Sequence, residues 1–217
     1  DVYFTPTPNG HKVSIMLEET GLAHRLLKMD MLAGDHLTPE YRRINPNGRL
    51  PAIVDHEPIG GNAPLPVFES GAILLHLAEK DEALLPRDPQ GRATVISWLF
   101  AAYNSVEPLM FELSNVDLFA AEEEWAKLRR PALMEFIQQR FGKLAEALGD
   151  RPYLAGDFSV ADIAMATVLR EGIASGAIAE HRALEAYLAR CLDRPAFDRA
   201  LKAQLAAFRE EAGPVGK

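Results

Sequence analysis

The sequence predicts two domains, an α/β domain at the N-terminus and an all-α domain at the C-terminus. Three observations predict this arrangement. Short apolar segments bounded by proline and glycine lie before residue 80, helical periodicity fills the chain after Gly91, and a segment rich in charge and proline lies between them. We expect the α/β domain at residues 1–80, a linker at 81–90 and a helical bundle at 91–217.

The first half of the α/β domain has the pattern of a βαβ unit. Residues 2–4 form a short apolar strand that ends before two prolines, and apolar side chains then recur at helical spacing up to Gly21. Residues 24–31 alternate between apolar and polar side chains, as the two faces of a strand require. The connection between the two strands is expected to be right-handed.

The second half of this domain has the pattern of a ββα unit. LPAIVD at residues 50–55 and PLPVFE at residues 64–69 are two predicted strands, and a turn-rich segment separates them. SGAILLHLAEK at residues 70–80 is a predicted helix. Proline and charged residues at positions 80–91 then predict the linker.

The C-terminal domain shows amphipathic helical patterns and no convincing strand. The apolar stripes of its first two long helices consist of Val95, Leu99, Ala102, Val106 and Met110, and of Ile137, Phe141, Leu144 and Leu148. Pro131 precedes the second stripe and is expected to kink or divide its helix.

One helix start in this domain is specified by several residues at once. Ser159 can accept a hydrogen bond from the backbone of Asp162, whose carboxylate can reach back, and Phe158 can pack on Ile163. We interpret this pattern as a capping box with a structural role.

The composition argues against several classes of partner. A net charge of -8 and an isoelectric point near 5.3 disfavour a nucleic-acid groove or an anionic membrane surface as the main partner. Cys191 is the single cysteine, so no intrachain disulfide forms, and we expect it to be a small buried residue. Without a signal-peptide pattern or a membrane-spanning apolar run, we expect a soluble, cytoplasmic protein.

The sequence predicts no metal centre and no dinucleotide site. The six histidines are scattered, with no His-Glu-x-x-His pattern and no cluster with cysteine. The IGGN segment at residues 59–62 does not match the Gly-x-Gly-x-x-Gly pattern of dinucleotide-binding loops.

The loop between the first strand and the first helix is the strongest indication of function. A helix N-terminus offers unpaired N–H groups and the positive end of the helix dipole, which favour an anion such as a thiolate. Redox proteins of the thioredoxin type carry Cys-x-x-Cys at this place, whereas this loop reads TPNG at residues 7–10. We therefore expect the loop to serve a thiol that a ligand supplies.

These features together resemble a cytosolic glutathione transferase over essentially the whole chain. NPNGRLPAIVD at residues 45–55 resembles the segment around the family's cis-proline, and FESGAILLHLAEK at 68–80 resembles its Glu/Gln-Ser-x-Ala-Ile motif. LAGDFSVADIA at residues 154–164 resembles its capping-box helix, and TPNGHK at 7–12 is similar to the loop of the Nu class. The resemblance implies a thioredoxin-like first domain, a homodimer and glutathione as co-substrate, with no metal.

The resemblance implies that Asn9 and Thr7 contact the glutathione sulfur, since Nu-class members use Thr and Asn there. The amide N–H of Asn9 and the hydroxyl of Thr7 can both donate to a thiolate. The alternatives are that Asn9 is only a helix N-cap and that Thr7 is an ordinary turn residue. Tyr3 offers a rival hydroxyl, but its place within a strand favours a core role.

The resemblance also assigns residues that bind the rest of glutathione. Pro51 is expected to be the cis-proline, which lets the backbone of Leu50 pair with the cysteinyl backbone of glutathione like an added strand. Ser70 and the adjacent N–H groups hold the γ-glutamyl carboxylate, and Glu69 takes the ammonium. The alternatives are a plain proline at the start of a strand and a helix-capping role for Ser70.

Weaker assignments follow from position in the family alone. His36 and Arg49 are candidates for contacts near the glycyl end, although a solvated surface role is the alternative for both. Arg129 or Arg130 in the helical domain is a candidate for contact with a glutathione carboxylate.

The sequence therefore predicts glutathione-dependent reduction of disulfide bonds. Two alternatives remain open at this point. The same thiolate can conjugate glutathione to carbon electrophiles, or the chain can be a glutathione-binding regulatory domain that catalyses nothing.

Overall fold

The computed structural model describes residues 1–81 and 84–209. The chain forms two compact units, one made by residues 1–82 with 194–217 and the other by residues 83–193. Residues 82–83 of the expected linker and 210–217 of the expected helical domain lie outside the described residues. The expected domain bounds follow the chain, whereas the units follow spatial contacts, so the segment after residue 193 belongs with the first unit.

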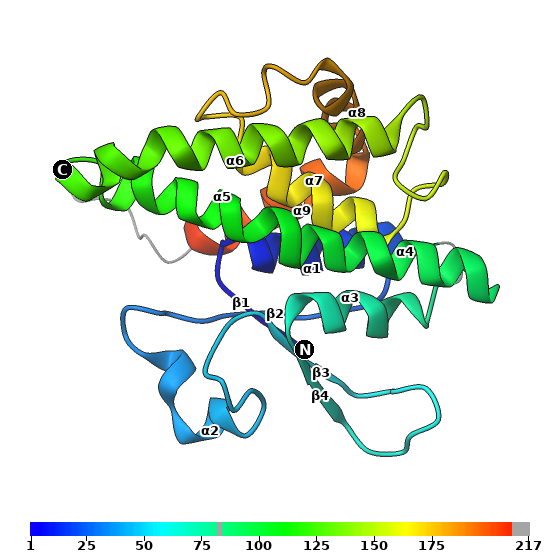
Figure 1. The fold of residues 1–217 in the computed structure, drawn as a ribbon. Coiled ribbons are helices and arrows are strands. Elements are labelled where there is room, and N and C mark those ends of the chain that lie inside the picture. The colour runs from blue at the N-terminus through cyan, green and yellow to red at the C-terminus, as the bar shows by residue number, and fades with distance from the viewer. Residues whose placement is uncertain (82–83, 210–217) are drawn as a thin grey trace. The chain divides into compact units, whose positions relative to one another are not determined.

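The first unit is built on a four-stranded sheet with the strand order β2-β1-β3-β4. The strands are β1 (Val2–Phe4), β2 (Leu26–Lys28), β3 (Ala52–Asp55) and β4 (Leu65–Phe68). β1 pairs parallel with β2 and antiparallel with β3, and β3 pairs antiparallel with β4 (Figure 1). The predicted order of βαβ followed by ββα is confirmed.

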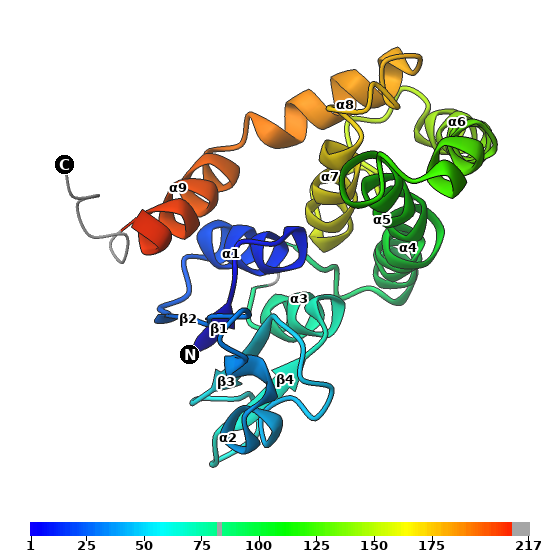
Figure 2. The ribbon, with the colours of Figure 1, turned by 90° about the vertical axis from the view of Figure 1, so that its left-hand side faces the viewer.

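Two helices cover one face of this sheet. α1 (Pro8–Thr20) connects β1 to β2, and α3 (Ser70–Ala78) follows β4. Both lie on the same face of the sheet, and the short helix α2 (Pro39–Arg42) lies on the other (Figures 1 and 2). The core of the unit includes the fully or almost fully buried side chains of Val2, Phe4, Ile15, Ile53, Ile73 and Leu74. Burial of these apolar groups stabilises the helix layer on the sheet.

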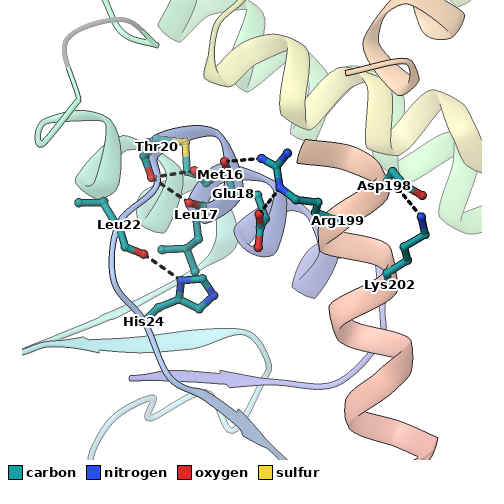
Figure 3. Close-up of polar contacts among 9 residues, drawn as sticks. All are labelled: Met16, Leu17, Glu18, Thr20, Leu22, His24, Asp198, Arg199 and Lys202. Atoms are coloured by element: carbon teal, nitrogen blue, oxygen red, sulfur yellow. Dashed lines mark hydrogen bonds and ion pairs between the residues drawn. The ribbon is translucent and has the colours of Figure 1, made fainter. Parts of the chain in front are cut away.

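The last described helix, α9 (Pro195–Arg209), packs along α1 within the first unit (Figure 2). Just before α9, Arg194 binds the carboxylate of Glu19 through two nitrogens, at 2.7 and 2.8 Å. Arg199 Nε lies 2.7 Å from the Glu18 carboxylate, and a second nitrogen donates to the Glu18 carbonyl at 3.1 Å (Figure 3). These contacts attach α9 to the C-terminal half of α1.

The second unit is helical, as the sequence predicts. Its segments are α4 (Pro89–Ala101), η2 (Ala102–Val106), α5 (Glu107–Ser114), η3 (Asn115–Phe119), α6 (Glu124–Leu148), α7 (Val160–Glu171) and α8 (Arg182–Leu192), where η2 and η3 are π-helical turns. Every residue of the two predicted apolar stripes is buried. Within residues 1–81 and 84–209, no helix has both the length and the apolar character needed to cross a bilayer.

α6 runs through Pro131 without being divided. A proline inside a helix removes one backbone hydrogen bond and costs about 3 kcal/mol. The following turns place Leu133, Ile137 and Phe141 in the core with no exposed surface. Burial of side chains of this size contributes about 1.5–3 kcal/mol each, which is enough to keep the helix continuous.

The predicted capping box is present at the start of α7. The Asp162 carboxylate accepts from the Ser159 N–H and hydroxyl, both at 2.9 Å, from the Leu154 N–H at 3.0 Å and from the Tyr187 hydroxyl at 2.9 Å. Burial raises the pKa of Asp162, against the opposing effect of these hydrogen bonds. Cys191, on α8, is buried as expected.

Candidate active site

Thr7 is the N-cap of α1. It has an extended backbone, with φ -113 and ψ 162, and its side-chain oxygen accepts from the Gly10 N–H at 3.3 Å. Pro8 occupies the first helical position, where a missing N–H costs nothing and the fixed φ suits the helix. The capping role considered for Asn9 therefore belongs to Thr7, and that alternative is wrong.

The loop before α1 folds back closely on the helix. Thr7 N–H donates to the Thr5 carbonyl at 2.7 Å. A β-carbon on Gly10 would lie 2.5 Å from that same carbonyl oxygen, so only glycine fits this approach. From the α9 side, Gln204 is buried and donates to the Ser14 hydroxyl at 2.9 Å. The first two turns of α1 are thus held between the preceding loop and α9.

The side chain of Asn9 has a defined orientation. Its carbonyl oxygen Oδ1 accepts from Lys12 Nζ at 2.8 Å and from Ser70 Oγ at 3.0 Å. An ammonium group has only donors, so it fixes which end of the amide faces it. The Nδ2 group, which is the donor end of the amide, consequently points away from Lys12.

Lys12 has no predicted role in the sequence, yet its side chain is fully buried. A lysine is almost never fully buried unless it is paired, and here it lies one helical turn after Asn9. Its neighbours Val13, Ile15 and Met16 are core residues. The sequence feature that could have identified Lys12 is its position as a basic residue within an apolar segment, three positions after the candidate site residue Asn9.

The cis peptide bond expected at Pro51 is present between Leu50 and Pro51. The preceding carbonyl, that of Arg49, accepts from the Tyr41 hydroxyl at 2.6 Å and from Asn45 Nδ2 at 2.7 Å. Burial raises the pKa of Tyr41 to about 12, so this hydroxyl stays a donor at neutral pH. Sequence reasoning missed Tyr41 and Asn45, which fix the segment that presents Leu50.

The turn between β4 and α3 has an unusual backbone. Glu69 has φ 67 and ψ 119, a conformation that residues other than glycine rarely adopt. Its carboxylate accepts from Asn47 Nδ2 at 3.3 Å. Ser70 is the first residue of α3 rather than its cap, and its hydroxyl donates to Asn9 instead of capping the helix. The helix-capping alternative for Ser70 is therefore wrong.

Three separate segments of the first unit thus meet around the predicted thiol position. The hydrogen bond from Ser70 to Asn9 joins the starts of α3 and α1. The hydrogen bond from Asn47 to Glu69 joins the cis-proline segment to the start of α3. No acidic residue occupies the first turn of α1, so its N-terminus keeps its positive potential for an anionic ligand, whereas the N-cap of α3 is the acidic residue Glu69.

The remaining candidates have different surroundings. Tyr3 lies in β1 and packs edge-on against the Tyr41 ring, but it is half-buried and does not belong to the buried core expected for it. The Arg49 side chain is exposed. The Nδ1 atom of His36 is buried without a hydrogen bond, and the His36 carbonyl oxygen would lie 3.1 Å from a β-carbon on Gly48. His36 and Arg49 therefore lie in segments next to one another, and their roles stay predictions.

The two candidate arginines, both in the second unit, are engaged in ion pairs. Arg130 Nε lies 2.7 Å from the Asp117 carboxylate, and Arg129 Nε lies 2.7 Å from the Glu112 carboxylate. These hydrogen bonds raise the pKa of both guanidinium groups. A contact of Arg130 with glutathione stays a prediction.

A surface cavity of about 460 Å³ lies elsewhere in the first unit, lined by Val2, Leu17, His24, Asp55, His56 and Lys80 among others. It includes none of the predicted site residues. Its charged groups pair with one another, since Lys80 Nζ lies 2.6 Å from the Asp55 carboxylate. Across residues 1–81 and 84–209, no group of three or more histidine, cysteine or acidic residues is arranged so that it could hold a metal ion.

Comparisons with known proteins point to one family. A family model for the glutathione S-transferase N-terminal domain matches residues 7–80. The disulfide-bond oxidoreductase YfcG of Escherichia coli strain K12 is 38% identical over 218 residues, which are 98% of this chain and 99% of that protein.

Two solved structures show the same similarity. One is a glutathione transferase from Burkholderia graminis with two glutathione molecules bound per subunit, with a TM-score of 0.87 and 38% identity over 93% of this chain and 87% of that chain. The other is a glutathione transferase from Pseudomonas putida with one glutathione disulfide bound per subunit, with a TM-score of 0.85 and 36% identity over 93% of this chain and 90% of that chain.

Proposed function

Because this chain belongs to the glutathione transferase family, we propose that it is an enzyme that binds glutathione at the start of α1 and uses the glutathione thiolate to reduce disulfide bonds. One observation carries the proposal. The position that suits a thiolate has the donors of Thr7 and Asn9 and no cysteine, while Cys191 is buried on α8 in the other unit. The reacting sulfur must then come from the ligand.

Glutathione is held by the three segments that meet at the site. The cysteinyl backbone pairs with Leu50, beside the cis peptide bond, in the manner of an added strand. The γ-glutamyl carboxylate lies at the N-terminus of α3 with Ser70, and its ammonium lies at the Glu69 carboxylate. Arg49 and His36 contribute near the glycyl end.

The donors at α1 favour the ionised form of the thiol. A free thiol has a pKa of about 8.5 and is mostly protonated at neutral pH. A decrease of about two units makes it mostly thiolate and corresponds to roughly 2.7 kcal/mol of differential stabilisation. The Thr7 hydroxyl, the Asn9 amide and the helix N-terminus together can supply that amount.

The reaction is two successive thiol–disulfide exchanges. The bound thiolate attacks one sulfur of the substrate disulfide, a mixed disulfide with glutathione forms, and the other sulfur leaves as a thiolate that takes up a proton. A second glutathione thiolate attacks the glutathione sulfur of the mixed disulfide and releases the second substrate thiol. The sum consumes two glutathione molecules and one disulfide and yields glutathione disulfide and two thiols.

The activity named for one relative and the ligands bound to two others support this reaction. The Escherichia coli relative is named a disulfide-bond oxidoreductase. The two bacterial transferases hold two glutathione molecules or one glutathione disulfide per subunit, which are the reductant and the oxidised product of such a cycle.

The test is reduction of 2-hydroxyethyl disulfide by glutathione, coupled to glutathione reductase, for the parent and for Asn9→Ala. We expect turnover in the parent and a loss of about ten- to a hundredfold in Asn9→Ala, since a donor to a developing anion is removed. Asn62→Ala, at an exposed position in the turn before β4, is the matched control and should behave like the parent.

The same preparations are assayed with an aryl halide to separate the other candidate activities. Turnover of the aryl halide without turnover of the disulfide would replace the proposal with glutathione conjugation. Binding of glutathione with neither activity would replace it with a binding domain.

We also propose that the protein is a cytoplasmic homodimer. Large apolar side chains are exposed on the second unit, including Phe100, Phe111, Trp125 and Phe136, and such surfaces are typical of subunit interfaces. The single cysteine of the sequence agrees with a reducing compartment. Sedimentation equilibrium measures the subunit number directly, and a monomer at all concentrations would contradict the dimer.

A further inference from the structure

We propose that Lys12 is a positioning residue that holds the Asn9 amide with its nitrogen toward the sulfur of bound glutathione. The proposal rests on the proposed function, because it assigns a task to a residue behind the thiolate site. Lys12 does not itself touch the sulfur in this arrangement. It acts through Asn9, to whose Oδ1 its ammonium donates at 2.8 Å.

An asparagine side chain can rotate by half a turn and exchange its oxygen and nitrogen with little change in shape. Only one of the two orientations serves a thiolate, because the amide oxygen would repel the sulfur anion while the N–H₂ group donates to it. The site therefore needs a neighbour that accepts one orientation and rejects the other.

Of the two contacts at Asn9 Oδ1, only the contact with Lys12 can make this choice. Ser70 Oγ lies 3.0 Å from the same oxygen, but a hydroxyl both donates and accepts and can satisfy either end of an amide. An ammonium has no acceptor, so a rotated Asn9 would turn its N–H₂ donors toward the Nζ donors. Lys12 is thus the residue that excludes the unproductive orientation.

The surroundings of Lys12 support a fixed rather than a solvated side chain. Its side chain has no exposed surface, and it extends from the first turns of α1, whose residues 10–17 are all buried. A lysine in this setting loses rotamer freedom and hydration, which is tolerated where its hydrogen bonds have a task. A methionine in its place would fill a similar volume without the donor.

The test is a double-mutant cycle of Lys12→Met and Asn9→Ala, read from the ultraviolet absorbance of bound glutathione thiolate against pH and from disulfide turnover. We expect Lys12→Met to raise the pKa of the bound thiol and to lower kcat about tenfold, while KM for glutathione stays within about threefold. In the Asn9→Ala background, Lys12→Met should have almost no further effect on either quantity.

Three further variants keep the test decisive. Lys12→Leu also removes the ammonium and completes the cycle if Lys12→Met does not fold. Lys12→Gln keeps a neutral donor for Asn9 Oδ1 and should recover part of the lost turnover. Lys202→Met, on the exposed face of α9, is the matched lysine control and should behave like the parent.

The outcomes separate this inference from the proposed function. If the parent binds no thiolate and reduces no disulfide, the proposed function fails and this inference fails with it. If the parent does both, an unchanged thiol pKa and kcat in Lys12→Met, additive effects in the cycle, or no recovery in Lys12→Gln would overturn the positioning role alone.

Discussion

The hydroxyl of Ser70 donates to Oδ1 of Asn9 across 3.0 Å, although the two residues are 61 positions apart in the chain. The contact joins the first turn of α1 to the first turn of α3. In the proposed complex the first of these turns stabilises the glutathione sulfur and the second binds the γ-glutamyl carboxylate. One hydrogen bond thus links the two parts of the site.

This link leads to a prediction for Ser70→Ala. We expect KM for glutathione to rise about tenfold, because in the complex the single proton of the Ser70 hydroxyl turns from Asn9 Oδ1 to the γ-glutamyl carboxylate, and a hydrogen bond to a charged group is worth about 1.5–3 kcal/mol. We expect kcat to stay within about threefold of the parent, because Lys12 still orients Asn9. Steady-state kinetics at varied glutathione separates the two quantities.

Ser97→Ala is the matched control for this prediction. Ser97 is exposed on α4, where its hydroxyl donates only to a carbonyl one turn earlier, at 2.8 Å. A fall in kcat of Ser70→Ala with no change in KM would assign Ser70 to the sulfur end of the site instead.

Much of the candidate site can be proposed from the sequence because each segment carries its own local pattern. The loop at Thr7, the proline at position 51 and the Glu-Ser pair at 69–70 each have a sequence signal within a few residues. Lys12, Tyr41 and Asn45 were missed because their roles depend on hydrogen bonds between segments. Such bonds leave no periodic pattern in a sequence.

The fold shows the same division between local and non-local information. The strands and long helices follow from apolar periodicity, whereas α2 and the 3-10 turn η1 (Asp35–Leu37) are too short to show any. The sequence pattern of α9 predicts a helix, but it does not predict that this helix packs against α1. Its contacts with α1, including Arg199 with Glu18, depend on the three-dimensional course of the chain (Figure 3).

Glu69 provides a prediction about both backbone strain and glutathione binding. Among residues 1–81 and 84–209 it is the one non-glycine residue with a positive φ. Glycine adopts this conformation without the steric cost of a β-carbon. We expect Glu69→Gly to be more stable to unfolding than Glu69→Ala by about 1 kcal/mol, since both variants lose the carboxylate but only alanine keeps the strain.

Glutathione binding by these two variants is the second half of the prediction. Both should bind glutathione more weakly than the parent, because neither offers a carboxylate to the γ-glutamyl ammonium. Urea unfolding gives the stability difference, and isothermal titration calorimetry gives the affinities. Parent-like affinity in either variant would remove Glu69 from the proposed site.

Asp55 links the end of β3 to the helix layer. Its carboxylate lies 2.8 Å from His76 Nε2 on α3 and 2.6 Å from Lys80 Nζ just beyond it. Burial raises the pKa of Asp55, but the hydrogen bonds from Lys80 and His76 outweigh burial and lower the value from 3.8 to about 2. The folded state therefore binds a proton at Asp55 less readily than the unfolded chain does.

This difference in pKa predicts the pH dependence of stability for Asp55→Asn. Because the folded-state pKa is depressed, the stabilisation from Asp55 is complete above pH 4 and disappears as the pH falls from about 4 to about 2. We expect Asp55→Asn to lower the free energy of unfolding by about 1 kcal/mol at neutral pH, after allowance for solvent screening. The difference from the parent should shrink steadily in that acidic range.

The measurement is chemical unfolding of both proteins at several pH values. Asp198→Asn is the matched control, because the ion pair of Asp198 with Lys202 is largely exposed and such pairs contribute little. If the parent and Asp55→Asn were equally stable at neutral pH, the contacts of Asp55 with Lys80 and His76 would not hold α3 on the sheet. A difference that stayed constant down to pH 2 would instead mean that the effect comes from packing and not from the charge.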